Sequence, residues 1–256
     1  MNRNLALFFI ALLSLLPAVR ATELSPPPPT SDWSFSLSPY LWVAAVKVET
    51  TLDSEPPPPG PTPPTSPDKF ETKLSGGALL AAQVHYKSLG LWADFVWIQT
   101  TTDALQSGPL YSAKELKSDF YHSTIALSYT VTTPDNYHLE FLAGARYWSV
   151  DAQVNASAGA LPAFSASQKE TWVTPVIGAD LRCDFNAQWS LLLKGTFAVG
   201  NYDSNGWEAM GGVAYKFGPS WSATLGYRYL HEEYKRERFA YFTDVSGVVL
   251  GASWQF

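Results

Sequence analysis

The chain has little of what a soluble enzyme or a helical membrane protein requires. Its one cysteine, Cys183, excludes an intramolecular disulfide and a cysteine-based metal site. Beyond the N-terminal segment, no run of about 18 consecutive apolar residues occurs, which excludes a bundle of membrane-spanning helices. Charged residues make up only 16% of the chain, against about 25% in a typical soluble domain. We therefore expect part of the protein surface to contact an environment less polar than water, such as lipid.

Motifs for cofactor chemistry are also missing. The sequence contains no phosphate-binding glycine loop, paired-histidine metal motif or cysteine cluster, so we predict no cofactor and no metal. The net charge of −6 makes nucleic acid an unfavourable partner. One group resembles catalytic residues: His231, Glu232 and Glu233 near the end of a predicted strand. A histidine beside two glutamates at a rim is more typical of a solvated loop edge, so we predict no catalytic residues.

The N-terminal segment is typical of an export signal. Residues 1–21 combine Arg3, an apolar run of about a dozen residues and a small-residue cleavage site at 19–21. We predict that this signal peptide is removed, which raises the net negative charge. Residues 22–32 contain four consecutive prolines and are predicted to form an extended periplasmic leader. The folded domain is then expected to span residues 33–256.

Alternating apolar and polar residues predict about ten β-strands in this domain. Short turns near residues 88–90, 132–137, 185–188 and 218–220 alternate with longer polar connections. Long extracellular loops are predicted at about 50–75, which is rich in proline, and at 102–117 and 152–168. This layout predicts an all-β fold, a closed antiparallel up-and-down transmembrane β-barrel. Eight strands remain the alternative if the weak segment 77–87 does not form a separate strand.

The position of charged residues within the strands indicates which face is wet. In the strand from residue 138, Leu139, Phe141 and Ala143 share one face, while Glu140 and Arg146 share the other. A membrane barrel is apolar outside and polar inside, whereas a soluble ligand-binding barrel has the reverse arrangement. The predicted inward charges are Asp94, Glu140, Arg146, Asp180, Arg182, Lys194, Glu208 and Arg228. His85 and His122 are also predicted to face inward.

Several segments resemble known barrels. The signal peptide, the strand at 144–148, residues 172–182, the strand at 226–229 and the terminal Phe256 carry the resemblance. The chain resembles the superfamily of small bacterial outer-membrane barrels that includes the OmpA-like transmembrane domain. This resemblance implies a location in the outer membrane of a Gram-negative cell, among lipids and lipopolysaccharide. It also implies that Phe256 is the assembly signal recognised by the barrel-assembly machinery.

Three functions follow as hypotheses. The main one is a non-enzymatic outer-membrane protein with a structural or surface-interaction role, whose lumen is plugged by salt bridges, because charges facing each other across a narrow barrel need partners. The alternative is a narrow, porin-like channel for small solutes. The third is an outer-membrane hydrolase that uses His231 or the inward carboxylates.

Overall fold

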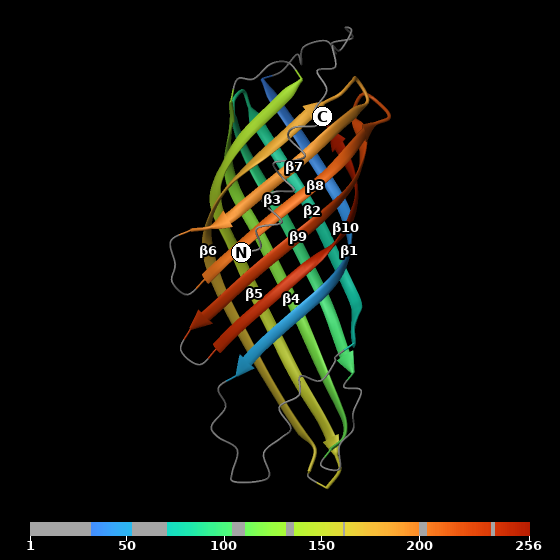
Figure 1. The fold of residues 1–256 in the computed structure, drawn as a ribbon, viewed down its shortest axis with the longest axis vertical. Helices are drawn as coiled ribbons and strands as arrows, with labels where there is room; N and C mark the ends of the chain where they lie inside the picture. Colours follow the sequence, from blue (N-terminus) through green and yellow to red (C-terminus); the bar gives the residue numbers. More distant parts are fainter. Residues whose placement is uncertain are drawn as a thin grey trace, which may run out of the picture.

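The protein forms a closed β-barrel of ten strands (Figure 1). This computed structural model describes residues 32–52, 71–103, 111–131, 136–160, 162–199, 204–236 and 239–256. In these ranges no helix is long and apolar enough to cross a membrane. The strands are β1 (Trp33–Leu52), β2 (Glu71–Tyr86), β3 (Leu89–Asp103), β4 (Tyr111–Val131), β5 (Tyr137–Ala158), β6 (Phe164–Asp184), β7 (Trp189–Ala198), β8 (Ser204–Lys216), β9 (Trp221–Arg236) and β10 (Phe239–Gln255).

The first and last strands close the barrel. β1 pairs antiparallel with β10, with Leu37 opposite Trp254. The backbones of Phe35 and Phe256 exchange two hydrogen bonds, of 2.9 and 3.0 Å. All other strands pair with their neighbours in the sequence, as an up-and-down barrel requires. The predicted fold class and the ten-strand count are confirmed, and the segment 77–87 belongs to a strand of its own, β2.

Two ends of the barrel can be distinguished. The turn end carries Trp33, Phe256 and the short connections, and it lies at the top of Figure 1. At the opposite, distal end, β4, β5 and β6 reach further than the other strands (Figure 1). The extension is continuous sheet, because β5 pairs with β4 as far as Ala158 and with β6 as far as Ala156.

This extension corrects two predicted loops. Much of 102–117 belongs to β3 and β4, and much of 152–168 belongs to β5 and β6. Their small and polar residues resemble a loop in composition, but their backbones pair with those of the neighbouring strands. Of the predicted loop at 50–75, residues 50–52 lie in β1 and 71–75 in β2. Residues 53–70, the signal peptide and most of the leader lie outside the described ranges.

Pairing around the barrel is incomplete at two places toward the distal end. β1 contacts β2 only as far as the pair Pro39 and Leu80, although both strands continue beyond it. β6 contacts β7 only as far as Val176 and Ala198. The carbonyl of Pro175 still accepts a hydrogen bond from Val199, but proline has no N–H with which to extend the ladder. In the described distal part, the strands β2 to β6 therefore pair only with one another. The strands β7, β8, β9, β10 and β1 form a second paired group.

Side chains alternate between the two faces as the sequence predicts. Leu41, Val43 and Leu127 point outward and are exposed, whereas Arg146 and Arg228 point inward and are buried. The interior is, however, not polar throughout. Toward the distal end it holds an aromatic core built around Trp148, which the alternation of apolar and polar residues did not predict. The other aromatic members of this core are Trp42, Phe120, Trp172, Tyr234 and Tyr241.

Candidate functional site

Four charged side chains form a continuous network across the lumen, named here the central layer. Arg228 Nη2 lies 2.6 Å from Asp94 Oδ2 and 2.9 Å from Glu208 Oε1. The second oxygen of Glu208 lies 2.8 Å from Arg146 Nη2. All four side chains are nearly inaccessible to solvent. Because these residues come from β3, β5, β8 and β9, the network ties distant parts of the wall together.

Hydroxyl groups complete the central layer. Arg228 donates a hydrogen bond of 2.6 Å to the Tyr40 hydroxyl, which donates one of 2.6 Å to Asp94. Arg146 donates to Thr124 over 3.1 Å and to Thr196 over 2.7 Å. Buried charges are tolerated when ion pairs and further hydrogen bonds replace the lost water. The central layer meets most of this requirement from side chains on β1, β4 and β7.

A second set of ion pairs lies nearer the turn end. His85 Nε2 is 3.0 Å from Glu140, and Lys194 Nζ is 3.2 Å from Asp180. Lys194 also lies 3.7 Å from the ring centroid of Trp92, close enough for a cation–π contact. These side chains are partly exposed, in contrast to those of the central layer. Most of the predicted inward charges therefore lie at two positions along the barrel axis, one in the central layer and one nearer the turn end.

One predicted member of the network occupies a different place. Arg182 forms an ion pair of 2.7 Å with Asp184, two residues along the same strand, and its side chain is 43% exposed. It lies at the turn end, where β6 reaches the rim. Arg182 is therefore not part of the central layer, in which Glu208 pairs with both buried arginines and Asp94 pairs with Arg228. The alternation of side chains predicts that Arg182 faces inward. It does not predict where Arg182 lies along the barrel axis.

Glu232 is a buried acid, whereas its place beside His231 and Glu233 predicts a solvated rim. Its Oε1 accepts hydrogen bonds from Trp172 Nε1 over 3.2 Å and from Ser204 over 2.8 Å. A Cβ atom at Gly206 would lie only 2.1 Å from Oε2, so glycine leaves space for this oxygen. The sequence does predict an inward position for Glu232, because it lies an even number of residues after the inward Arg228 in the same strand.

The aromatic core lies directly beyond the central layer. The rings of Trp148 and Trp172 are stacked with centroids 5.6 Å apart, and Trp172 stacks on Tyr234 at 4.4 Å. The ring of His122 lies 4.7 Å from that of Trp148, and its Nε2 is 3.4 Å from Thr124. Apolar packing therefore lies next to the ion pairs inside the barrel.

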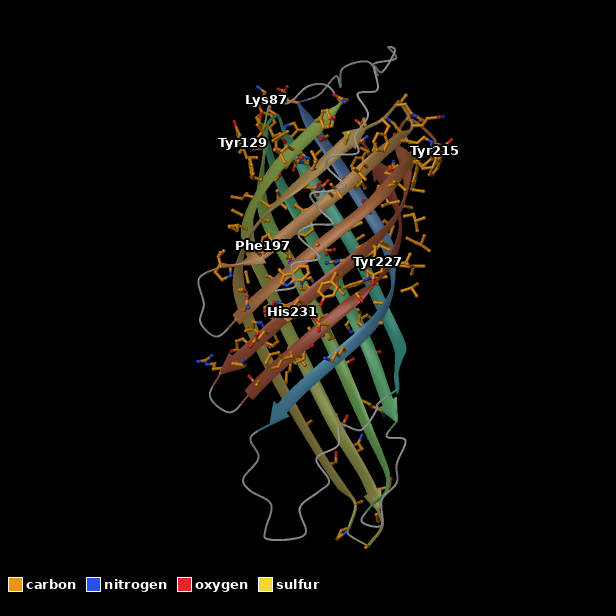
Figure 2. The ribbon with its side chains drawn as sticks, viewed as in Figure 1. Lys87, Tyr129, Phe197, Tyr215, Tyr227 and His231 are labelled. Atoms are coloured by element: carbon orange, nitrogen blue, oxygen red, sulfur yellow. The ribbon has the colours of Figure 1, made fainter. Side chains whose placement is uncertain are left out.

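His231, the predicted rim histidine, lies on the outer wall. Its Nδ1 is 2.8 Å from Asp244 on β10, and the Tyr229 hydroxyl donates a hydrogen bond of 2.7 Å to the same carboxylate. Figure 2 shows His231 and Tyr227 on the wall facing the viewer. A carboxylate orients the imidazole as in a general base. No serine, threonine or cysteine of the described ranges makes a hydrogen bond with His231, and these ranges contain no cluster suited to a metal ion.

Outward aromatic residues gather toward both ends of the wall. At the turn end, the rings of Trp189 and Tyr215 lie 4.8 Å apart, and Trp221 stacks on Trp254 at 5.9 Å. Toward the distal end, Trp207 stacks on Tyr229 at 4.7 Å. Tyr129 and Tyr215 lie near the turn end in Figure 2, while Phe197 lies closer to the middle. Such paired belts occur in barrels that cross lipid.

The fold is similar to that of solved outer-membrane barrels. No family model matches the sequence, and no curated protein matches it. The outer membrane protease OmpT of Escherichia coli superposes with a TM-score of 0.57, at 8% identity, covering 89% of this chain and 98% of OmpT. The transport unit of the autotransporter AIDA-I, also from Escherichia coli, has a TM-score of 0.44, at 9% identity and 97% coverage of both chains.

At this identity the likeness to OmpT concerns the fold alone. It shows that the chain has the architecture of an outer-membrane β-barrel, in agreement with the resemblance noted from the sequence. A shared fold does not by itself select a role.

Proposed function

We propose that the chain is an integral outer-membrane protein with a closed lumen and a non-catalytic, structural or surface-interaction role. The outer wall supports the membrane location. Leu41 and Val43 are 64% and 67% exposed, and they belong to a band of outward apolar side chains bounded by aromatic residues. An apolar band of this extent is unfavourable in water but matches the hydrocarbon core of a bilayer.

The observation that carries the closed lumen is the central layer. Asp94, Arg146, Glu208 and Arg228 are buried and joined by contacts of 2.6 to 2.9 Å. A solute or ion crossing the barrel would have to separate these pairs and also pass the aromatic core. Separating a buried pair leaves an uncompensated charge, which is costly. The arrangement therefore favours a plug over a narrow channel.

The distal extension supports a role at the cell surface. With both chain ends in the periplasm, β4, β5 and β6 would project outside the cell and offer a solvated sheet for contact with other molecules. Lipopolysaccharide and lipids would surround the barrel. Phe256, at the turn end beside Phe35, would act as the signal for the barrel-assembly machinery.

Conductance in planar bilayers tests the plug. We expect no reproducible open steps for the wild-type protein. Arg146→Ala combined with Arg228→Ala and Trp148→Ala should produce steps, because the three substitutions remove both cations of the central layer and the centre of the aromatic core. Lys235→Ala is the control, since Lys235 is exposed at the end of β9. Resistance of the folded band to detergent would verify that each variant forms a barrel. Steps in the wild-type protein would support the channel alternative and contradict the closed lumen.

A hydrolase is the second candidate, favoured by the contacts of Asp244 with His231 and Tyr229. Purified protein would be assayed with casein and with a short-chain lipid ester. Activity that is lost in His231→Gln and retained in His138→Gln would establish this role. His138 is a matched control because its ring lies 3.5 Å from Asp184 at the opposite end of the barrel. Equal activity in both variants, or none in the wild type, would contradict it.

A further inference from the structure

The interior holds a buried histidine that takes no part in the ion pairs. His122 lies on β4 and is fully buried. Its ring centroid lies 4.7 Å from that of Trp148 and 6.4 Å from that of Phe120, and both of these residues belong to the aromatic core. On its other side lies Thr124, a hydroxyl of the central layer. His122 therefore lies where the aromatic core meets the central layer.

The Thr124 hydroxyl connects His122 to a buried cation. Arg146 Nε donates a hydrogen bond of 3.1 Å to Thr124 Oγ1, and His122 Nε2 lies 3.4 Å from the same oxygen. While the ring is neutral, the hydroxyl can donate its own proton to Nε2 and still accept from Arg146. A protonated ring would place a second positive donor on that oxygen. One neutral hydroxyl would then lie between two cations.

The ionisable groups nearest to His122 are either cations or already paired. Arg146 on β5 and Arg228 on β9 are both positive and buried. Glu208 on β8 pairs with both arginines, and Asp94 on β3, which lies opposite Thr124 in the register, pairs with Arg228. A proton on His122 would therefore change a balance of two cations and two carboxylates into three cations and two carboxylates.

The remaining buried acid of this region does not supply a partner either. Glu232 on β9 directs its Oε1 to Trp172 and Ser204. In the part of the chain that the structure describes, His122 Nδ1 has no hydrogen-bond partner. The contact of the ring with Thr124 is therefore its polar anchor, and no carboxylate stands ready to accept from a protonated ring.

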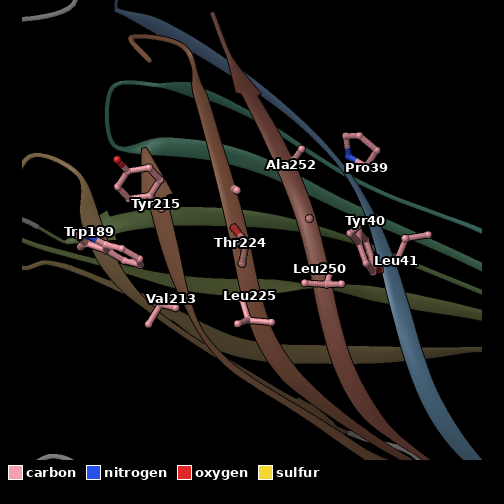
Figure 3. A pocket seen from close by; sticks show the side chains of 12 residues that line it. Pro39, Tyr40, Leu41, Trp189, Val213, Tyr215, Thr224, Leu225, Leu250 and Ala252 are labelled. Carbon is pink, nitrogen blue, oxygen red and sulfur yellow. The ribbon is translucent and has the colours of Figure 1, made fainter. Parts of the chain in front are cut away.

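Water cannot replace the missing carboxylate while the barrel is closed. The ion pair of Lys194 and Asp180 near the turn end is partly exposed, whereas the central layer is nearly inaccessible to solvent. The outer wall over β7, β8, β9, β10 and β1 is mainly apolar, even in a hollow of about 600 Å³ (Figure 3). The Trp148 ring attracts a cation, but it replaces only a small part of the hydration that a charged group loses on burial. A charged His122 therefore requires the interior to loosen.

We propose that His122 is an acid-sensitive switch in the closed interior, whose protonation separates the central layer from the aromatic core and loosens the barrel below about pH 6. This inference rests on the proposed closed lumen, because an open lumen would hydrate the ring at any pH. The unfolded chain exposes the ring and takes up a proton at the ordinary pKa of histidine, about 6.5. Because the unfolded chain then binds more protons than the closed barrel, the barrel loses stability as the pH falls.

Urea unfolding of the full chain in detergent micelles, at about pH 7.5 and at about pH 5, tests the switch. His122→Gln and His122→Phe cannot titrate at this position. Between the two pH values, the unfolding equilibrium constant of the wild type should rise about 30-fold more than that of either variant. Each protein is compared with itself, so a general loss of stability in a variant does not affect the result. His138→Gln is the matched control and should behave as the wild type does, because His138 is half exposed at the turn end.

Hydrogen exchange of the backbone amides shows where the loosening begins. After correction for the effect of pH on the intrinsic exchange rate, the amides of β4 and β5 next to His122 and Trp148 should lose protection in acid. The paired amides of β7 and β8 at the turn end should keep their protection. In His122→Gln, the amides of β4 and β5 should also keep theirs.

The outcomes separate the switch from the proposed function. Conductance steps of the wild type at neutral pH would overturn the closed lumen and, with it, the switch. A silent wild type whose unfolding depends on pH as that of the His122 variants does would overturn the switch alone. An equal loss of protection throughout the wild-type barrel would also overturn it, since the effect of acid would then not begin at His122.

Discussion

Arg146 and Glu208 lie 62 residues apart in the sequence and meet inside the barrel at 2.8 Å. Arg146 comes from β5 and Glu208 from β8, so their contact spans two intervening strands. Glu208 also contacts Arg228, which makes it the carboxylate shared by two buried guanidinium groups. Glu208 therefore links Arg146 to Arg228 and, through Arg228, to Asp94.

Glu208→Ala should destabilise the barrel by about 3 to 5 kcal/mol, because it leaves two buried cations facing each other. Urea unfolding in detergent micelles, followed by intrinsic fluorescence, would measure the change. Glu233→Ala is the control: Glu233 pairs with the exposed Lys235, and an exposed pair contributes less than about 1 kcal/mol. Similar losses in the two variants would show that the central layer is not important for stability.

Gly144 allows β4 and β5 to approach each other closely. A Cβ atom at this position would lie 2.0 Å from the carbonyl oxygen of Ile125 and 2.5 Å from the Cα of Ala126. We expect Gly144→Ala to cost about 1 to 3 kcal/mol in free energy of unfolding, since the strands must move apart. Gly218→Ala provides the comparison, because a Cβ there meets nothing within 4 Å. A neutral Gly144→Ala would contradict the close approach.

Trp148 is the centre of the aromatic core and is fully buried against Phe120, His122 and Trp172. Trp148→Ala should lower the free energy of unfolding by about 3 to 5 kcal/mol, because it removes a large packed side chain. Trp189→Ala, on the outer wall, should cost much less. Differential scanning calorimetry in micelles would compare the two. Equal effects would show that the interior is loosely packed.

Substitution of Phe256 can separate its predicted role in assembly from any role in the stability of the folded barrel. Its side chain is 60% exposed, and its backbone hydrogen bonds to Phe35 do not depend on the aromatic ring. We expect Phe256→Ser to refold in detergent as the wild type does, yet to accumulate less in the outer membrane of cells. Phe217→Ser, an exposed phenylalanine at the same end, should accumulate normally. Normal accumulation of Phe256→Ser would remove the assembly role.

Much of the wall could be predicted from the sequence. Alternation at every second residue gives the facing of Glu140, Arg146 and Arg228, and the same rule applied to Glu232 gives its inward position. The distal extension was missed, because composition does not distinguish a polar loop from a polar strand that is paired along both edges. The aromatic core could not be predicted in this way. Its residues face inward, as the charged residues do, and differ from them only in their position along the barrel axis.

The amino-acid sequence is sufficient to predict a closed barrel with an apolar outside and ionisable groups inside. Facing is a local property that follows from the two-residue repeat of a strand. Only the folded barrel shows that Glu208 joins Arg146 to Arg228 and that Arg182 lies at the rim. Those relationships depend on the register and tilt of strands far apart in the chain, which set the height of each side chain in the barrel.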